Sequence, residues 1–335
     1  MKIDVRGRSF LTLMDFSTEE IRYMLDLAHK LKAKKKSGKI GDLLAGKNIV
    51  LLFDKTSTRT RCSFEVAAMD EGAGVTFLDK NSSQFGKKES VEDSARVLGR
   101  FYDGIEYRGF EQSLVEDLSK YSGVPVWNGL TDIDHPTQIL ADMLTMEEHI
   151  DKPLNECKVV FCGDIRNNMS YAWMYGCAKM GIDFTAFGPD ELEVDPEVLA
   201  RAREVAAETG SQITVSSDVA AVKGADVLYT DVWASMGEED QIPDRVRLLT
   251  PYKVTKELMD ATGNPDVLFM HCLPAFHDFE TQMASEWMEK GIDIREVTDE
   301  VFRSRNSVVF DEAENRMHSI KAVVVATMAD DPDRD

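Results

Sequence analysis

Short apolar runs alternate along this chain with longer segments in which apolar residues recur every three or four positions. Residues 18–36 form the first such segment, and its apolar residues share one face of a helix that Ser17 opens with a capping box. The apolar run NIVLLF at 48–53 predicts a buried strand, and a helical pattern follows over about 60–71. Strands that alternate with helices are typical of parallel sheets.

The same alternation continues to the end of the chain. In the first half it predicts strands at 75–78, 104–109 and 124–129 and helices at 90–101 and 135–149. In the second half it predicts strands at 158–163, 184–189, 226–231, 267–274 and 307–313 and helices at 169–181, 197–210 and 317–329. We therefore predict an α/β protein of two domains, residues 1–150 and 151–317, each a parallel β-sheet flanked by helices.

The 335-residue chain carries a net charge of −21, which restricts the ligands it can take. A nucleic-acid-binding face needs clustered positive charge, so this composition argues against nucleic acid. The basic cluster at 30–39 falls at a predicted helix end, where cations suit the helix dipole, and we interpret it as a solvated helix end. Any anion that the protein binds therefore requires a local concentration of cations.

Cysteine usage and hydropathy bear on the compartment. Five cysteines at irregular spacing, with no CxxC pair, predict neither a disulfide framework nor a zinc site, so we expect no metal. No apolar run reaches the roughly 18 residues that a membrane span requires, and the N-terminus lacks a signal-peptide pattern. A cytoplasmic protein that binds no membrane is the simplest interpretation.

Polar residues crowd the joint between the first predicted strand and its helix, namely Ser57, Thr58, Arg59, Thr60 and Arg61. The amides and the dipole of a helix N-terminus bind anions, and hydroxyls and guanidinium forks add donors that fit phosphate. A capped helix with surface arginines is the alternative, and we favour the phosphate site. The sequence matches neither GxxxxGK[ST] nor GxGxxG, so we expect no nucleotide cofactor.

Three further clusters follow predicted strands, at the edge where parallel α/β sheets bind ligands. HPTQ at 135–138 opens a helix, where a neutral His135 could donate to a carbonyl oxygen or simply cap the helix. HCLPAFH at 271–277 could supply metal ligands or a nucleophilic Cys272, but we prefer a loop that presents backbone carbonyls. DVWASMG at 231–237 is either a mobile acidic loop or a lid that recognises an amino group.

Together, STRTR, HPTQ, HCLPA and SMG resemble the ornithine carbamoyltransferase family. The similarity covers nearly the whole chain, including GKKESVEDSARVLGRFYDGIEYRG at 86–109 and FDEAENRMHSIKAV at 310–323. STRTR and HPTQ are shared with the wider superfamily and imply carbamoyl phosphate, whereas HCLP and DVWASMG imply L-ornithine as the acceptor. The resemblance also implies two helices that link the domains, with a C-terminal helix at 318–335 completing the first domain.

The resemblance implies a role for each candidate residue. Arg108 and His135 would polarise the carbonyl group of carbamoyl phosphate, and Asp231 and Cys272 would position the attacking amine or lower its pKa. Contacts to carbamoyl phosphate would come from Ser57, Thr58, Arg59, Thr60, Arg61, Gln84, Arg108, His135, Gln138, Cys272, Leu273 and Arg316. Contacts to L-ornithine would come from Asn168, Asp231, Ser235 and Met236, with Asn167 as a less favoured neighbour of Asn168.

The expected reaction transfers a carbamoyl group to the δ-amine of L-ornithine and yields L-citrulline and phosphate, without a cofactor. Because Gln84 would enter a neighbouring subunit's site, the resemblance implies a homotrimer or a multiple of trimers. One alternative is a related acceptor, such as putrescine or an acetylated ornithine, which the SMG loop disfavours. Another is a non-catalytic sensor of carbamoyl phosphate, which the complete set of motifs disfavours.

Overall fold

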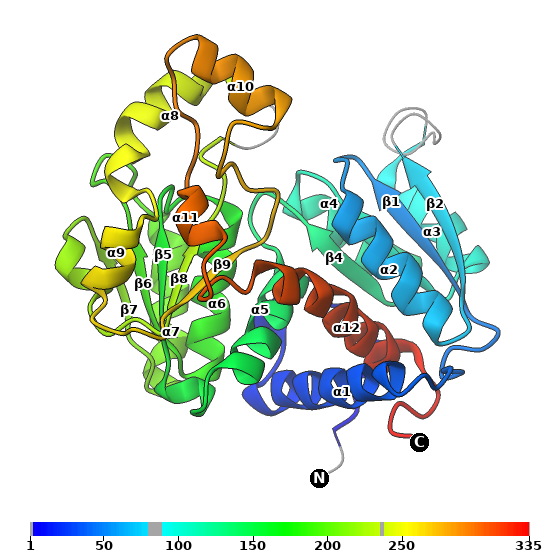
Figure 1. The fold of residues 1–335 in the computed structure, drawn as a ribbon. Coiled ribbons are helices and arrows are strands. Elements are labelled where there is room, and N and C mark those ends of the chain that lie inside the picture. Colours follow the sequence, from blue (N-terminus) through cyan, green and yellow to red (C-terminus); the bar gives the residue numbers. More distant parts are fainter. Residues whose placement is uncertain (1–2, 80–88, 235–237, 335) are drawn as a thin grey trace. The chain divides into compact units, whose positions relative to one another are not determined.

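The computed structural model describes residues 3–79, 89–234 and 238–334 (Figure 1). The chain divides into two compact units, which are named here by their order. Unit 1 contains residues 1–144 and 313–335, and unit 2 contains residues 145–312. The candidate site residues Gln84, Ser235 and Met236 lie outside the described residues.

Unit 1 is built on a parallel sheet with the strand order β2-β1-β3-β4. Its strands are β1 (Asn48–Phe53), β2 (Gly74–Asp79), β3 (Gly104–Arg108) and β4 (Val126–Leu130). Its helices are α1 (Thr18–Lys36), α2 (Thr58–Asp70), α3 (Val91–Phe101), α4 (Gln112–Ser122), most of α5 (Pro136–His149) and most of α12 (Val309–Met328).

Unit 2 is built on a second parallel sheet, with the strand order β7-β6-β5-β8-β9. Its strands are β5 (Lys158–Cys162), β6 (Asp183–Phe187), β7 (Ile213–Ser216), β8 (Val227–Thr230) and β9 (Leu268–His271). Its helices are α6 (Asn168–Met180), α7 (Pro196–Thr209), α8 (Ile242–Leu249), α9 (Lys256–Ala261), α10 (Gln282–Glu289) and α11 (Asp299–Phe302). The predicted architecture of two parallel sheets flanked by helices is therefore confirmed.

Both faces of the first sheet are covered, which explains why β1 is apolar and buried from Ile49 to Phe53 and why all of β3 is buried. On one face, Val50 and Ile105 pack with Val115 of α4 in a buried cluster. On the other face, the Trp127 ring lies 6.2 Å from Phe64 of α2, and its Nε1 donates to Thr327 Oγ1 of α12 at 2.9 Å. The last helix of the chain is thus an integral part of the first unit.

The final stretch of the chain differs from the sequence prediction. The predicted strand at 307–313 is wrong, because only Ser307 bridges Phe269 and α12 already begins at Val309. The short apolar run VVF fits a strand or a helix, and here it forms the buried start of a long helix, with Val309 only 1% exposed. The division between the units also falls inside helices α5 and α12 rather than in the segment after residue 150.

Candidate active site

The joint between β1 and α2 is a capped helix N-terminus at the carboxyl edge of the first sheet. Ser57 is the N-cap of α2, and its side chain accepts a hydrogen bond from Thr60 N at 3.2 Å. Thr58 is the first helical residue and lies exposed, whereas Thr60 is buried beneath it. The remaining amides of the first turn are those that a helix leaves without helical partners, so this end of α2 suits an anion.

Two buried arginines from distant parts of unit 1 converge on Thr60. Arg108, at the end of β3, donates from Nη1 to Thr60 Oγ1 at 3.2 Å, and Arg316 of α12 donates from Nη2 to the same oxygen at 3.3 Å. They are only 8% and 3% exposed. We call Ser57, Thr58, Thr60, Arg108 and Arg316 the cationic cradle. Its charge is concentrated in a chain of net charge −21, which is the arrangement that anion binding requires.

Gln138 ties the first turn of α5 to the cradle. Arg316 Nη1 donates to Gln138 Oε1 at 2.5 Å, and Gln138 Nε2 donates to Asp142 Oδ1 at 2.7 Å. Arg316 Nη2 also lies 3.4 Å from Gly129 O. The amide of Gln138 is therefore held between a cation and a carboxylate, which fixes which of its ends is the acceptor.

His135 directly precedes α5 and is buried beside the same arginines. Burial holds its pKa well below the usual value, and the charges of Arg316, Arg108 and Arg59 lower that pKa further. The imidazole is therefore neutral at physiological pH. Its Nδ1 has no hydrogen-bond partner among the described residues, so a neutral ring nitrogen remains available for a ligand.

Arg61, one of the two arginines of the STRTR segment, has partners outside the cationic cradle. Its guanidinium lies 3.6 Å from the centre of the Phe77 ring, and its Nε pairs with Glu65 at 2.9 Å on the outer side of α2. Arg61 is also more exposed than Thr60. The structure thus brings Thr60, Arg108, Gln138 and Arg316 into direct contact with one another and gives Arg61 other partners.

Sequence analysis missed Glu106, which lies on β3 two residues before Arg108. Glu106 is fully buried, and neither carboxyl oxygen has a hydrogen-bond partner among the described residues. Burial raises its pKa well above the usual value, although Arg108 and Arg316 oppose the shift. A Cβ atom at Gly129 would overlap Glu106 Oε1, so glycine makes room for this acid. A glutamate in the middle of the predicted buried strand GIEYR was the available signal.

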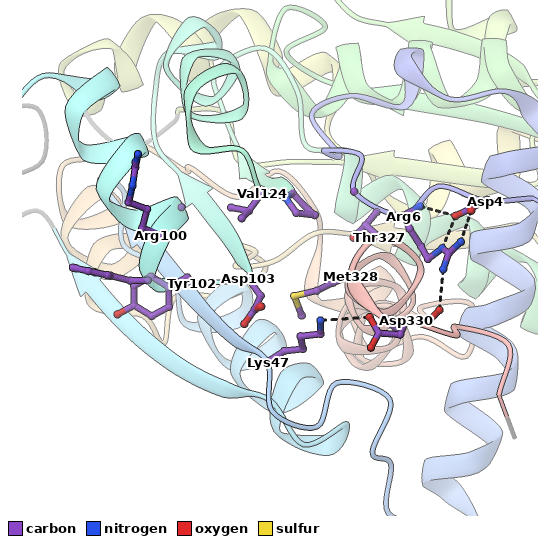
Figure 2. Close-up of a pocket in the computed structure, with 15 residues that line it drawn as sticks. Asp4, Arg6, Lys47, Arg100, Tyr102, Asp103, Val124, Thr327, Met328 and Asp330 are labelled. Carbon is purple, nitrogen blue, oxygen red and sulfur yellow. Dashed lines mark hydrogen bonds and ion pairs between the residues drawn. The ribbon is translucent and has the colours of Figure 1, made fainter.

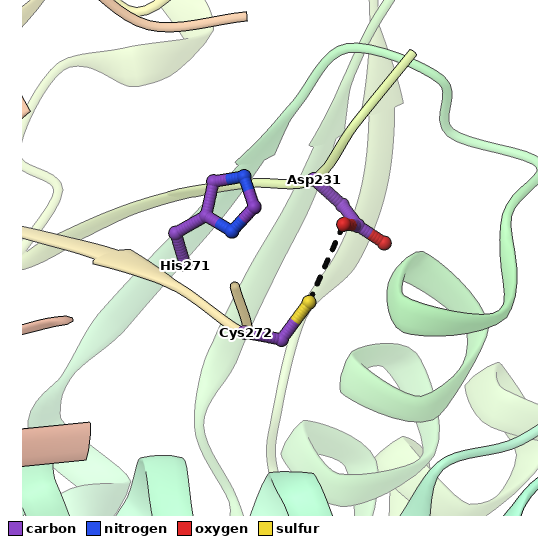
Figure 3. Close-up of side chains that lie close together, drawn as sticks. All are labelled: Asp231, His271 and Cys272. Carbon is purple, nitrogen blue, oxygen red and sulfur yellow. Dashed lines mark hydrogen bonds between the residues drawn. The ribbon is translucent and has the colours of Figure 1, made fainter. Parts of the chain in front are cut away.

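In unit 2, Asp231 and Cys272 meet at the carboxyl edge of the second sheet (Figure 3). Cys272 Sγ lies 3.3 Å from Asp231 Oδ1, and Val232 N donates to the same oxygen at 2.8 Å. Asn167 Nδ2 lies 3.4 Å from Asp231 Oδ2. Asn167 also caps α6 through its Oδ1, whereas the favoured Asn168 is the first helical residue. The carboxylate is thus held by three groups from different loops.

The HCLP segment is held by His271 and two buried glutamates. His271 Nδ1 accepts the Leu273 N–H at 2.9 Å, and Nε2 lies 3.0 Å from Glu296 Oε1. The backbone N–H of His271 donates to Glu312 Oε2 at 2.9 Å. Leu273 has a φ of 57°, an unfavourable value for a leucine, and the imidazole bond supports this conformation. The carbonyls around Cys272 and Leu273 are therefore fixed in direction.

Among the residues that the structure describes, two groups of side chains have the residue types of a metal site. Asp231, His271 and Cys272 form the first, but both ring nitrogens of His271 already take part in hydrogen bonds, so no lone pair faces an ion. His277, Asp278 and Asp299 form the second, and there Arg303 Nε donates to Asp299 Oδ1 at 2.8 Å. A guanidinium supplies the positive charge that a metal would bring, so neither set fits a resident ion.

A separate pocket of about 640 Å³ opens at the amino edge of the first sheet (Figure 2). Four of its charged residues contact one another, since Arg6 bonds both Asp4 and the Asp330 carbonyl and Lys47 lies 3.5 Å from Asp330. Tyr102 and Met328 also line it. Ligands of parallel α/β sheets bind at the opposite, carboxyl edge, where the cationic cradle lies, so this pocket is not the candidate site.

Family comparison agrees with this division of residues. A family model described as "Aspartate/ornithine carbamoyltransferase, carbamoyl-P binding domain" matches residues 8–148. A second, described as "Aspartate/ornithine carbamoyltransferase, Asp/Orn binding domain", matches residues 155–327. The chain therefore belongs to the aspartate/ornithine carbamoyltransferase family. No helix within the described residues has the length and apolar character to cross a membrane.

Individual relatives are named for the ornithine branch of that family. The chain is 66% identical to "Ornithine carbamoyltransferase, catabolic" of Clostridium perfringens, over 98% of this chain and 99% of the relative. It is 58% identical to the ornithine carbamoyltransferase of Limosilactobacillus reuteri, over 98% and 99%. The solved ornithine carbamoyltransferase of Pyrococcus furiosus matches with a TM-score of 0.89 at 41% identity, over 98% and 99%.

Proposed function

We propose that this protein is a carbamoyltransferase that moves the carbamoyl group of carbamoyl phosphate to the δ-amine of L-ornithine, giving L-citrulline and phosphate in arginine metabolism. The observation that carries the proposal is the convergence of Arg108 and Arg316 on Thr60 beside a helix N-terminus. Relatives at 66% and 58% identity, named as ornithine carbamoyltransferases, support the acceptor.

In unit 1, the cationic cradle binds the phosphate and polarises the carbamoyl carbonyl. The Ser57-capped start of α2 supplies amides and hydroxyls for the phosphate oxygens, with Arg59 and Arg61 adding charge. Arg108, Arg316 and a neutral His135 donate to the carbonyl oxygen, where negative charge grows in the transition state. A neutral imidazole can present an N–H to this oxygen without charging a buried ring.

In unit 2, Asp231 binds the α-ammonium group of L-ornithine. Asn168, Ser235 and Met236 serve the α-carboxylate, and Asn167 helps to hold Asp231 through its side-chain amide. Backbone carbonyls near Cys272 and Leu273, with Gln138, accept hydrogen bonds from the carbamoyl NH₂ group. Fixed carbonyls suit this task because an NH₂ group presents two donors, whereas a hydroxyl presents one and a methyl group none.

The proton balance of the reaction requires no dedicated base. The δ-amine has a pKa near that of lysine, roughly 10.4, so the minor neutral form attacks the carbonyl carbon and phosphate leaves. The departing phosphate accepts the proton that the amine loses. Cys272 and Asp231 orient the amine, and catalysis rests on orientation and electrostatic stabilisation.

A competition assay tests the acceptor. Purified protein is supplied with carbamoyl phosphate and equal concentrations of L-ornithine, putrescine, N-acetylornithine and L-aspartate, and the products are separated by mass. L-citrulline should dominate, and preference for another acceptor would overturn the assignment. If no carbamoyl product forms although calorimetry detects carbamoyl phosphate binding, the protein is a sensor rather than an enzyme.

We also propose a homotrimer, or a multiple of trimers, in which Gln84 enters the neighbouring subunit's site. Phe110 and Ile133, near the carboxyl edge of the first sheet, are 39% and 41% exposed, which suits a contact between copies. Gln84→Ala and Arg108→Ala proteins should each be nearly inactive. Mixed trimers should regain part of the activity, because one of their sites combines an intact Arg108 with an intact Gln84. Absence of recovery in verified mixed trimers would contradict the shared site.

The proposed compartment is the cytoplasm. All five cysteines are free thiols, and Cys157, Cys162 and Cys177 are buried. Unpaired thiols are typical of proteins in a reducing compartment. Fractionation of the source cells with an antibody against the protein would test this assignment.

A further inference from the structure

Helix α8 carries a buried ion pair that the proposed reaction does not use. Arg245 of α8 and Asp164, two residues after β5, are each 8% exposed, and Arg245 Nη1 pairs with Asp164 Oδ2. Arg245 Nη2 also donates to Gln241 Oε1 at 3.2 Å. Asp164 lies in the loop that leads to the cap of α6, where Asn167 contacts Asp231. The pair therefore fastens α8 to the loop after β5.

The apolar side of α8 is fastened to a different loop. Ile242 of α8 packs with Ala284 of α10 and with Ile294 in a small buried cluster, which we call the satellite core. Phe276, from the loop after β9, and Trp287 of α10 pack against it. Figure 1 draws α8 and α10 side by side within unit 2. This cluster has no residue in common with the main core of the unit.

The loop after β8 is the third one attached to α8. It begins at Asp231, and its residue Ala234 packs against the satellite core. Phe276 N in turn donates to Glu296 Oε1 at 2.7 Å, the oxygen that faces His271. The loops that carry Asn167, Asp231 and Cys272 follow three different strands, and α8 contacts the loop after β5 through charge and the other two through the satellite core.

We propose that α8, held by Arg245, is the element that positions the acceptor half of the site, and that Arg245 is a positioning residue for binding of the amino-acid acceptor. This inference rests on the proposed function. Arg245 does not touch the acceptor in the arrangement described. Arg245 fixes the distance between the Asp164 loop and α8. The loops after β8 and β9 in turn pack against α8 through the satellite core, so the position of α8 determines where these loops lie.

Chemistry explains why arginine suits this position. A guanidinium is planar and presents several donors in a fixed fork, so Arg245 can bond Asp164 and Gln241 at once. A lysine keeps the charge but has a single ammonium group at a different reach. Both partners are buried, and each has only weaker alternatives. Asp164 would keep Arg166 Nε at 3.4 Å, and Arg245 would keep Glu238 Oε1 at 3.7 Å. Removing either partner therefore leaves a buried charge with poorer compensation, and we expect the loops to rearrange.

The test measures the KM of each substrate in the Arg245→Gln, Arg245→Lys and Asp164→Asn proteins. Arg247→Gln is the matched control, because Arg247 lies on the same helix, 70% of its side chain is exposed, and it pairs only loosely with Asp244 at 3.8 Å. We expect the KM for L-ornithine to rise roughly tenfold or more in Arg245→Gln and less in Arg245→Lys, since one charge-assisted bond is lost. The KM for carbamoyl phosphate and the control should stay within about twofold of wild type.

Several results would overturn the inference. An unchanged KM for L-ornithine in folded Arg245→Gln protein would do so, as would equal rises for both substrates, because those indicate general unfolding. If Arg245→Gln does not fold, Arg245→Lys and Trp287→Ala decide, since each weakens one attachment of α8, and an unchanged KM for L-ornithine in both would reject the role. Failure of the proposed function is distinct, because wild-type protein would then make no citrulline.

Discussion

The candidate site has two halves, the cationic cradle of unit 1 and the group around Asp231 in unit 2, which we call the half-sites. They carry opposite charges and are built from different parts of the fold. In unit 1, buried cations converge on Thr60, and they stand on regular elements, since Arg108 ends β3 and Arg316 lies within α12. In unit 2, the central charge is the carboxylate of Asp231, and loops supply its partners. An anion is thus met by rigid, buried cations, and a cationic amino acid by a carboxylate on adjustable loops.

This difference fits the proposed division, with catalysis in unit 1 and acceptor choice in unit 2. Polarising a carbonyl requires donors that do not move as charge develops, which strands and helices provide. Choosing an acceptor requires contacts that can be varied without disturbing the core, which loops provide. The buried acid Glu106 beside the cradle has no hydrogen-bond partner among the described residues, whereas the buried acids Glu296 and Glu312 of the acceptor half each take part in hydrogen bonds.

The largest effect is expected from Arg108→Ala. Loss of one donor to the developing oxyanion costs about 2.7–4 kcal/mol, so kcat should fall by roughly 10²–10³ while the protein stays folded. Arg100→Ala is the matched control, because that arginine is exposed on α3 and bonds only the Arg96 carbonyl among the described contacts. Steady-state kinetics and circular dichroism check both variants. Near-normal turnover in Arg108→Ala would remove the cradle from catalysis.

Asp231→Asn should affect the other half-site. Hydrogen bonds to charged groups contribute about 1.5–3 kcal/mol, so the KM for L-ornithine should rise roughly ten- to hundredfold, with little change in the KM for carbamoyl phosphate. Asp266→Asn, at a side chain that is 84% exposed, serves as the control. A rise in the KM for carbamoyl phosphate instead would contradict the assignment of Asp231 to acceptor binding.

The pH dependence of stability should involve unit 1 through His318. Burial, and then the charge of Lys321, lower the pKa of His318 to about 4. The unfolded chain takes up a proton near pH 6.5, so stability is present above that pH and is lost as pH falls towards about 4, by up to roughly 1.4 kcal/mol per unit. Urea titrations at several pH values should show a shallower slope for His318→Gln. An equal slope would exclude this histidine.

Glu106→Gln should produce the smallest change in the pH dependence of stability. Its sign is opposite to that of the His318 effect. The raised pKa of Glu106 means that its contribution to stability is present below the unfolded pKa and is lost as pH rises above it. A glutamine has the shape of the protonated acid, so Glu106→Gln protein should lose less stability between acidic and neutral pH. Thermal melts over that range test this, and a steeper loss in the variant would contradict a neutral Glu106.

Much of unit 1 could be predicted because its chemistry lies close to strong local signals. STRTR follows an apolar strand directly, HPTQ has proline at a helix start, and the rule for strand ends places both at one edge with Arg108. Arg316 is 256 residues from Thr60, and only the family resemblance assigned it to this site. The wrong strand at 307–313 shows that a short apolar run does not reveal its secondary structure.

The contacts of the acceptor half, in unit 2, could be predicted from the sequence less well. Asp164 and Arg245 are 81 residues apart, and nothing in either segment shows that the two side chains are buried together. Helix α8 has only eight residues and a weak apolar pattern, so no helix was predicted there. In the doublet at 167–168, the side-chain amide that contacts Asp231 belongs to Asn167, which is the N-cap of α6. A sequence motif does not fix a helix boundary to a single residue, so it could not distinguish the two asparagines.

Because unit 1 combines residues 1–144 with residues 313–335, it is assembled from two stretches of the chain that unit 2 separates. During synthesis on the ribosome, all of unit 2 has been made before the Thr327 hydroxyl can reach the Trp127 ring. One face of the first sheet therefore stays incompletely covered until α12 has been translated. A premature stop just after residue 312 would leave the acceptor unit complete and the first unit without most of its final helix.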